Sequence, residues 1–184
     1  MPEVWSFIAP RPATVPVEQV HILLYSYFPS VPRGAPRPYV WRLLSPDRVG
    51  VISAMRPTAA KARCHELAAG TTLEFSLTYK RVRSVNGGER YVTISSMPEL
   101  RERLIAFAGQ RGAAIGYVRL DKMRDLQLSG GDRNIRIPIV DASGAMLVTD
   151  AERCAGLLAS GGPGTGKAFG CGAWWIPQIM EPDA

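Results

Sequence analysis

A glycine-rich segment near the end of the sequence combines a flexible backbone with a single positive charge. Residues 162–172 follow the pattern Gly-x-Gly-x-x-Lys-x-x-Gly-x-Gly, with Lys167 at the centre. The glycines concerned are Gly162, Gly164, Gly166, Gly170 and Gly172. Because glycine has no side chain, its backbone amide can approach a phosphate closely. The segment therefore predicts a phosphate-binding loop, and the simpler alternative is a flexible turn with a solvated lysine.

Residues 161–167 also fit the GxxxxGK spacing of nucleotide hydrolases, but their context does not. Ala168 stands where that motif requires the hydroxyl that holds Mg²⁺. A predicted helix precedes the segment where a strand is required, and too little chain follows Lys167 to complete a parallel sheet. These features argue against an ATPase or GTPase.

A histidine suited to proton transfer lies on the first predicted helix. Apolar residues recur there at helical spacing from Val17 until Pro29 ends the run. His21 lies on this helix, and histidine exchanges protons near neutral pH. Tyr25 follows one turn later on the same face, where it can orient a substrate. The alternatives are that His21 only packs between domains and that Tyr25 is an amphipathic core residue.

The composition favours a polyanionic partner and argues against a membrane or metal protein. Lys+Arg 22 against Asp+Glu 16 gives a net charge of +6. The three cysteines form no CxxC pair and the two histidines do not cluster, which disfavours a zinc site. No apolar run approaches the roughly 20 residues of a membrane span, and the start does not resemble an export signal. We therefore expect a soluble, cytoplasmic protein.

Residues 1–85 predict the order strand, helix, strand, strand, helix, strand, which is the ferredoxin-like pattern. The expected strands are 4–8, 39–44, 49–55 and 73–79. The second helix is expected after Thr58, with Ala60, Cys64, Leu67 and Ala68 on one face and Gly70 past its end.

Residues 86–184 repeat this plan after a boundary at Asn86-Gly87-Gly88. Ser96 and Glu99 have capping-box spacing at the start of a helix. The other expected elements are strands 91–94, 115–128, 135–140, 146–148 and 173–179 and a helix after Thr149. The sequence thus predicts an α+β protein of two tandem ferredoxin-like (RRM/RAMP-type) domains, 1–85 and 86–184, with the glycine-rich loop before the last strand.

The loop resembles the signature of CRISPR repeat-RNA-processing endoribonucleases, in particular the CasE subunit of type I-E Cascade complexes. In that family a G-x-G-x-x-K-x-x-G-x-G segment leads into the last strand of a second ferredoxin-like domain. The resemblance covers nearly the full length of the chain. It includes Gln19-Val20-His21, the Phe28-Pro29 stop, Leu73-x-Phe75-x-Leu77 and the order of elements after Val148.

The resemblance implies metal-independent cleavage of CRISPR precursor RNA at the base of the repeat hairpin, without a cofactor. The 2′-hydroxyl would attack the adjacent phosphorus and leave a 2′,3′-cyclic phosphate. His21 matches the position of the family's catalytic histidine, and Lys167 is suited to stabilise the charged phosphate. One departure is Glu18, which stands where well-known relatives carry a tyrosine.

The resemblance also implies that a basic hairpin in the second half grips the RNA stem, because double-stranded RNA is held through phosphates and shape. Relatives place arginines at alternate positions of the strand after Leu73, whereas this chain has them just beyond it. The expected RNA-binding side chains are Arg81, Arg83, Arg119, Lys122, Arg124, Arg133 and Arg136. For any one of them the alternative is a solvated surface charge, and the helix arginines Arg101, Arg103 and Arg111 are weaker candidates.

The leading hypothesis is an endoribonuclease that keeps its hairpin product as a subunit of a CRISPR effector complex. The expected partners are the repeat RNA hairpin and the other subunits of the complex. The alternative is an RNA-binding structural subunit with little or no cleavage activity, which Glu18 favours.

Overall fold

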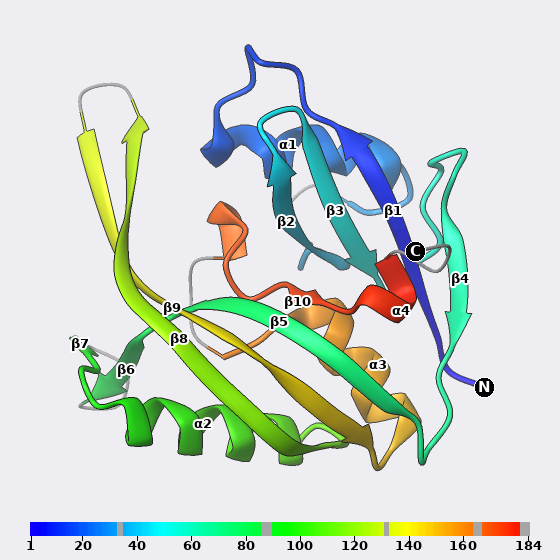
Figure 1. Cartoon of the computed structure of the whole chain (residues 1–184). Helices are drawn as coiled ribbons and strands as arrows, with labels where there is room; N and C mark the ends of the chain where they lie inside the picture. The colour runs from blue at the N-terminus through cyan, green and yellow to red at the C-terminus, as the bar shows by residue number, and fades with distance from the viewer. Residues whose placement is uncertain (33–34, 86–89, 131–132, 164–166, 181–184) are drawn as a thin grey trace.

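The computed structural model of the chain describes residues 1–32, 35–85, 90–130, 133–163 and 167–180 (Figure 1). In these ranges no helix is long and apolar enough to cross a membrane. The strands are β1 (Glu3–Pro10), β2 (Tyr39–Ser45), β3 (Arg48–Ser53), β4 (Arg63–Glu66), β5 (Thr72–Lys80), β6 (Val82–Val85), β7 (Arg90–Thr93), β8 (Ala113–Gly130), β9 (Arg133–Val148) and β10 (Trp174–Trp175). The helices are α1 (Val20–Leu24), α2 (Met97–Gly109), α3 (Ala151–Ser160) and α4 (Pro177–Met180), with 3-10 turns at Val17–Gln19, Tyr25–Tyr27 and Lys167–Phe169.

The first sheet has the antiparallel order β2-β3-β1-β4, which is the strand order of a ferredoxin-like domain. The chain passes from β1 to β2 through α1, as expected. The helix predicted after Thr58 is wrong, because residues 63–66 form β4 on the edge beside β1. Cys64 in this segment is exposed and Leu67 is buried, so the stripe of apolar residues does not face a core.

The second sheet has the order β10-β5-β9-β8, again the ferredoxin-like order, with α2 before β8 and α3 after β9. The Ser96 hydroxyl accepts a hydrogen bond from the Glu99 amide at 3.3 Å, which confirms the predicted start of α2. The α+β class with two ferredoxin-like domains is therefore confirmed.

The predicted place of β5 in the first sheet is wrong. β5 pairs with β9 and β10 and lies inside the second sheet. Strand 91–94 was expected to open the second domain, but β7 pairs with β6 in a separate two-stranded sheet. We therefore propose a domain boundary between Glu66 and Thr72, before the predicted one at 85/86.

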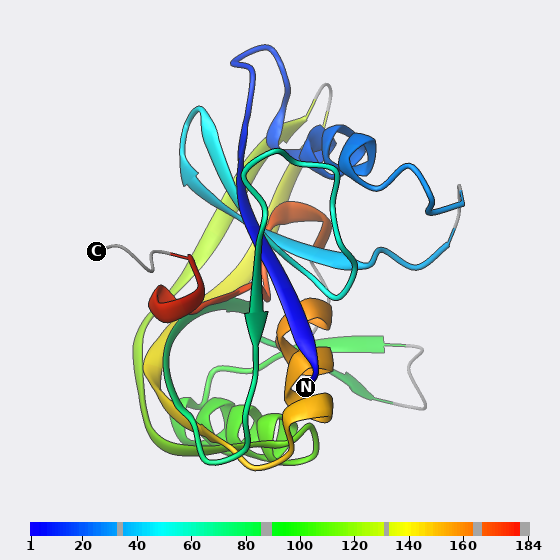
Figure 2. The same ribbon diagram turned by 90° about the vertical axis from the view of Figure 1, so that its right-hand side faces the viewer.

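The two sheets share an apolar core because α3 also packs against the first sheet (Figure 2). Cys154, Leu157 and Leu158 of α3 are buried with Val4 of β1 and Val40 of β2. On β2, Val40 lies in this core whereas its neighbour Trp41 packs with α1, so α3 covers the opposite face of the first sheet from α1.

The C-terminal segment contacts both domains, and its strand is shorter than predicted. Residues 173–179 were expected to form one strand, but β10 spans Trp174–Trp175 and α4 begins at Pro177. Trp174 is buried against Phe75 of β5, with the ring centroids 5.0 Å apart. A Cβ at Gly50 of β3 would lie 2.7 Å from Cζ3 of Trp175. The absence of a side chain at Gly50 therefore leaves room for the Trp175 indole ring.

Gly50→Ala is expected to destabilise the fold, because the added methyl group overlaps Trp175. Overpacking of this kind costs about 1–3 kcal/mol. Urea unfolding measures the loss. Gly109→Ala is the matched control, because a Cβ there meets nothing within 4 Å. A Gly50→Ala protein as stable as the Gly109→Ala protein would show that the indole does not rely on Gly50.

Candidate functional site

The first half of the site is α1, whose buried face fixes the position of His21. Val20 and Leu24 are completely buried in the apolar cluster of the first sheet. His21 is left half-buried beside that cluster. The Tyr39 hydroxyl of β2 donates a hydrogen bond to the His21 carbonyl oxygen at 2.6 Å. The backbone of His21 is thus held by the strand beneath it.

The surroundings of His21 favour its neutral imidazole. Burial and the positive charge of Arg37 lower the pKa of His21, and the backbone of Glu18 opposes them with a smaller effect. Nδ1 is buried and has no hydrogen-bond partner within the described ranges. A neutral imidazole can accept a proton, which is the requirement for a general base. Because Nδ1 is buried, a substrate outside the protein would have to meet the other ring nitrogen, Nε2.

The second half of the site is the 3-10 turn Lys167–Phe169, which packs against α1 and against the turn Val17–Gln19. The fold therefore brings the element of Lys167 to the element of His21. The Lys167 side chain is half-buried. Burial and the charges of Arg111 and Arg37 lower the pKa of its ammonium group.

Arg37 is the residue that the sequence analysis missed. Its charge lowers the pKa of both His21 and Lys167, so it acts on both halves of the site. It lies in the proline-rich segment before β2, where no periodicity marks a functional position. Arg111, considered only as a helix arginine, lies over the Phe107 ring at 3.8 Å from the centroid and acts on Lys167.

Tyr25 lies one turn after His21, as expected, and is half-buried. Its ring meets Tyr39 edge-on at 5.7 Å between centroids. Its hydroxyl donates to the Ala35 carbonyl oxygen over 3.5 Å, a long hydrogen bond. Tyr25 thus combines an apolar packing role with a loosely held hydroxyl, and its contact with a substrate stays a prediction.

The backbone amides of three loop glycines donate hydrogen bonds to carbonyl oxygens of the protein itself. The Gly162 amide donates to the Gly172 carbonyl oxygen, and the Gly172 amide donates to Thr78 of β5, both at 2.6 Å. The Gly170 amide donates to the Lys167 carbonyl oxygen at 3.3 Å. These bonds anchor the loop on β5, and phosphate binding by these glycines stays a prediction. Gly164 and Gly166 lie outside the described residues.

Close approach explains why a glycine is needed at position 170. Gly170 has a φ of +76°, and a Cβ there would lie 2.9 Å from the Trp41 ring. The loop follows α3 and leads into a 3-10 turn. This context differs from the strand-loop-helix arrangement of nucleotide hydrolases, as the sequence analysis expected.

The predicted RNA-binding residues of the second domain lie mostly on the long β8–β9 hairpin, which curves away from its sheet toward the end of the molecule that holds α1 (Figure 1). Arg119, Lys122, Arg124 and Arg136 are exposed there. The three arginines contact the carboxylates of Asp121, Asp141 and Asp125 respectively. The side chain of Arg133 lies outside the described residues.

The two remaining arginines differ in exposure. Arg83 is exposed and lies 3.7 Å from a carboxylate oxygen of Glu99. Arg81 is only 15% exposed and is bound by Asp125 and by the Ile94 carbonyl oxygen. Arg83 is thus open to an external anion, whereas Arg81 is held inside the protein.

Sequence comparison matches residues 9–173 to a family model described as "CRISPR associated protein". No curated protein matches the sequence. Nine-tenths of the chain or more also superimposes on solved structures of low sequence identity.

Thermus thermophilus Cse3, bound to an RNA representing a pre-cleavage complex, has a TM-score of 0.72 and 19% identity, covering 96% of this chain and 99% of that one. The CRISPR-associated protein Cas6e from Escherichia coli str. K-12 has a TM-score of 0.67 and 20% identity, covering 95% and 98%. A chain of a CRISPR RNA-guided surveillance complex has a TM-score of 0.59 and 17% identity, covering 94% and 98%. These similarities show a shared fold.

Proposed function

The chain belongs to the CRISPR-associated protein family, and from that membership we propose that it is an endoribonuclease that cleaves CRISPR precursor RNA at the base of the repeat hairpin. One observation carries most of this proposal: the element of Lys167 packs against the helix of His21. The elements that carry a proton-transfer group and a cation thus meet, although they are distant in the sequence. The similar fold of Cse3 holds RNA in a pre-cleavage complex, which supports the same substrate class here.

The proposed reaction begins when neutral His21 accepts the proton of the 2′-hydroxyl. The 2′-oxygen then forms a bond to the adjacent phosphorus, and the bond from phosphorus to the 5′-oxygen breaks. The negative charge on the phosphorane is stabilised by Lys167 and Arg37. The leaving 5′-oxygen takes a proton from Lys167, whose lowered pKa makes it a stronger acid. The products are a 2′,3′-cyclic phosphate and a 5′-hydroxyl, and no metal ion takes part.

The exposed arginines of the β8–β9 hairpin would hold the RNA stem through its phosphates. We propose that the protein keeps the hairpin after cleavage and joins a cytoplasmic effector complex. A chain of the same fold occurs in a CRISPR RNA-guided surveillance complex, which supports this assembly.

A second candidate is an RNA-holding subunit with little cleavage activity. It is favoured by Glu18 in the turn before α1, where a tyrosine is expected from the resemblance. The hydroxyl of Tyr25 is the nearest substitute on the same helical segment, and it is only loosely held.

Incubation of the protein in EDTA with end-labelled repeat RNA from its own locus tests the two candidates. Cleavage at the hairpin base with a cyclic-phosphate end is the expected result. Tight binding without cleavage would favour the structural subunit. Failure to bind the hairpin would contradict both.

Arg37→Ala is expected to lower the cleavage rate about tenfold, because one cation is removed from the site. The same change removes a charge that lowers the pKa of His21, so the acid limb of the pH–rate profile should move to higher pH. Single-turnover rates across pH measure both effects. Arg48→Ala, at an exposed position of β3, is the control. An unchanged acid limb would show that Arg37 does not act on His21.

A further inference from the structure

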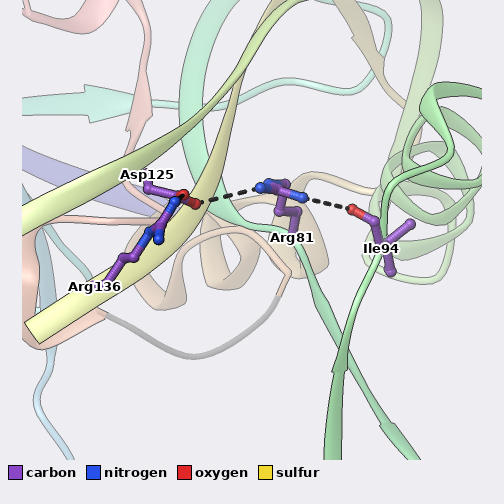
Figure 3. Close-up of polar contacts among 4 residues, drawn as sticks. All are labelled: Arg81, Ile94, Asp125 and Arg136. Atoms are coloured by element: carbon purple, nitrogen blue, oxygen red, sulfur yellow. Dashed lines mark hydrogen bonds and ion pairs between the residues drawn. The ribbon is translucent and has the colours of Figure 1, made fainter.

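Asp125 of β8 lies between two arginines of different exposure (Figure 3). Its Oδ1 accepts a hydrogen bond from Nη2 of Arg81 at 3.3 Å. Its Oδ2 accepts from Nε of Arg136 at 2.7 Å and lies 2.5 Å from Nη2 of the same residue. One carboxylate thus joins the largely buried guanidinium of Arg81 to the exposed guanidinium of Arg136.

The buried partner fixes this carboxylate. Nη1 of Arg81 donates to the Ile94 carbonyl oxygen at 3.2 Å, and the Arg81 amide donates to the Pro138 carbonyl oxygen at 3.0 Å. Arg81 is therefore tied to the segment after β7 and to β9. A buried guanidinium requires a counter-charge, so the position of Asp125 is strongly determined.

The exposed partner keeps donors for an external anion. Arg136 is 73% exposed. A guanidinium has five N–H donors, and Asp125 engages the Nε and Nη2 groups on one edge. The remaining N–H donors point away from that carboxylate oxygen and suit a phosphate.

Asp141 repeats the arrangement on β9. Its Oδ1 accepts from the Thr78 hydroxyl of β5 at 2.5 Å, and its Oδ2 accepts from Nε of Arg124 at 2.9 Å. Arg124 also reaches Oδ1 through Nη2 at 3.3 Å. Both aspartates therefore connect an exposed hairpin arginine to residues at the base of the hairpin, Thr78 on β5 and Arg81 just after it.

We propose that Asp125 and Asp141 are positioning residues that hold Arg136 and Arg124 in place to bind RNA phosphates. This inference rests on the proposed function, in which the β8–β9 hairpin grips the RNA stem. Preordering an arginine reduces the entropy lost on binding. Arg81 acts through Asp125 and does not touch the RNA.

The sign of the effect separates this proposal from simple electrostatics. Removing a negative charge beside a polyanion reduces repulsion and strengthens binding. Removing a positioning carboxylate weakens binding, although the net charge becomes more positive. Asp121 is the matched control, because it also pairs with an exposed hairpin arginine, Arg119 at 2.5 Å, but is not itself anchored. Asp121 is 39% exposed, and its only other hydrogen bond in the described part of the chain is a long one from Ser143 at 3.4 Å.

The experiment compares the dissociation constant of the repeat RNA hairpin for wild type, Asp125→Asn, Asp141→Asn, Asp121→Asn, Arg136→Ala and the double variant Asp125→Asn/Arg136→Ala. We expect Arg136→Ala to weaken binding about tenfold and to reduce the salt slope by about one. Asp125→Asn and Asp141→Asn are expected to weaken binding about threefold, and Asp121→Asn to leave it unchanged or slightly tighter. In the Arg136→Ala background, Asp125→Asn should have no further effect, because it acts through Arg136.

Thermal unfolding of each variant shows whether it is folded, and Asp141→Asn carries the test if Asp125→Asn unfolds. If the wild type binds the hairpin and both Asp125→Asn and Asp141→Asn bind it as tightly, this inference is overturned and the proposed function stays intact. This inference is also overturned if Arg136→Ala binds the hairpin with the wild-type dissociation constant. The same holds if the losses of affinity from Asp125→Asn and Arg136→Ala add in the double variant. No binding by the wild type would overturn the proposed function and this inference with it.

Discussion

His21→Ala is expected to lower the rate of hairpin cleavage by about 10²–10⁴-fold and to leave RNA affinity within about twofold. In the proposed mechanism the imidazole accepts the proton of the attacking 2′-hydroxyl, and alanine offers no group for this step. Binding should change little, because in the proposed function the β8–β9 hairpin of the other domain holds the stem. Single-turnover cleavage at saturating protein, together with a filter-binding isotherm, separates the two quantities.

His65→Ala is the control, since these are the two histidines of the chain. His65 lies on β4, away from α1, and its Nε2 forms a hydrogen bond with the Ser6 hydroxyl at 2.9 Å. Its variant should cleave at the wild-type rate. Wild-type cleavage by His21→Ala would remove the histidine from the mechanism and leave the RNA-binding surface untouched.

The pH dependence follows from the surroundings of His21. Burial and Arg37 lower its pKa from the ordinary 6.5, so the base stays neutral to lower pH. The rate should therefore fall as pH decreases through a value below 6.5. An acid limb above 6.5 would mean that an opposing charge, and not burial, dominates at this residue.

The alternation of apolar residues in β5 predicted a strand and its buried face, but not its neighbours. Leu73, Phe75 and Leu77 are buried as expected. That pattern is satisfied equally well in either sheet, and only the pairing with β9 and β10 assigns the strand. In the same way, apolar residues after Thr58 have helical spacing, and only the pairing of β4 with β1 shows that the segment is an edge strand.

In the candidate site, residues of distinctive type were found and their supporting residues were not. His21 and Lys167 are residues of uncommon type that the resemblance singled out, and the elements that carry them pack together. Asp125 and Arg136 are diagonal neighbours across the β8–β9 ladder, since Asp125 lies opposite Pro138. Their contact requires the register of the hairpin, which a survey of basic residues alone does not supply.

Lys167→Ala is expected to lower the cleavage rate by about 10²–10³-fold, which is the usual cost of losing one group that stabilises transition-state charge. Lys167 is half-buried in a turn that packs against α1, and a charge that is partly buried is screened less than one at the surface. Stability should not suffer, because the substitution removes a charge that burial disfavours. Single-turnover rates measure the loss, and Lys61→Ala, at an exposed lysine, is the control.

Lys167→Arg sharpens the test, because arginine keeps the charge at every accessible pH. Burial, Arg111 and Arg37 lower the pKa of Lys167 from 10.5, so the wild-type rate should fall at high pH as the lysine loses its proton. In Lys167→Arg this basic limb should disappear, whatever the maximal rate of the variant. A basic limb that persists unchanged would assign it to another group, and a Lys167→Ala enzyme of wild-type rate would leave Arg37 as the cation that stabilises the phosphorane.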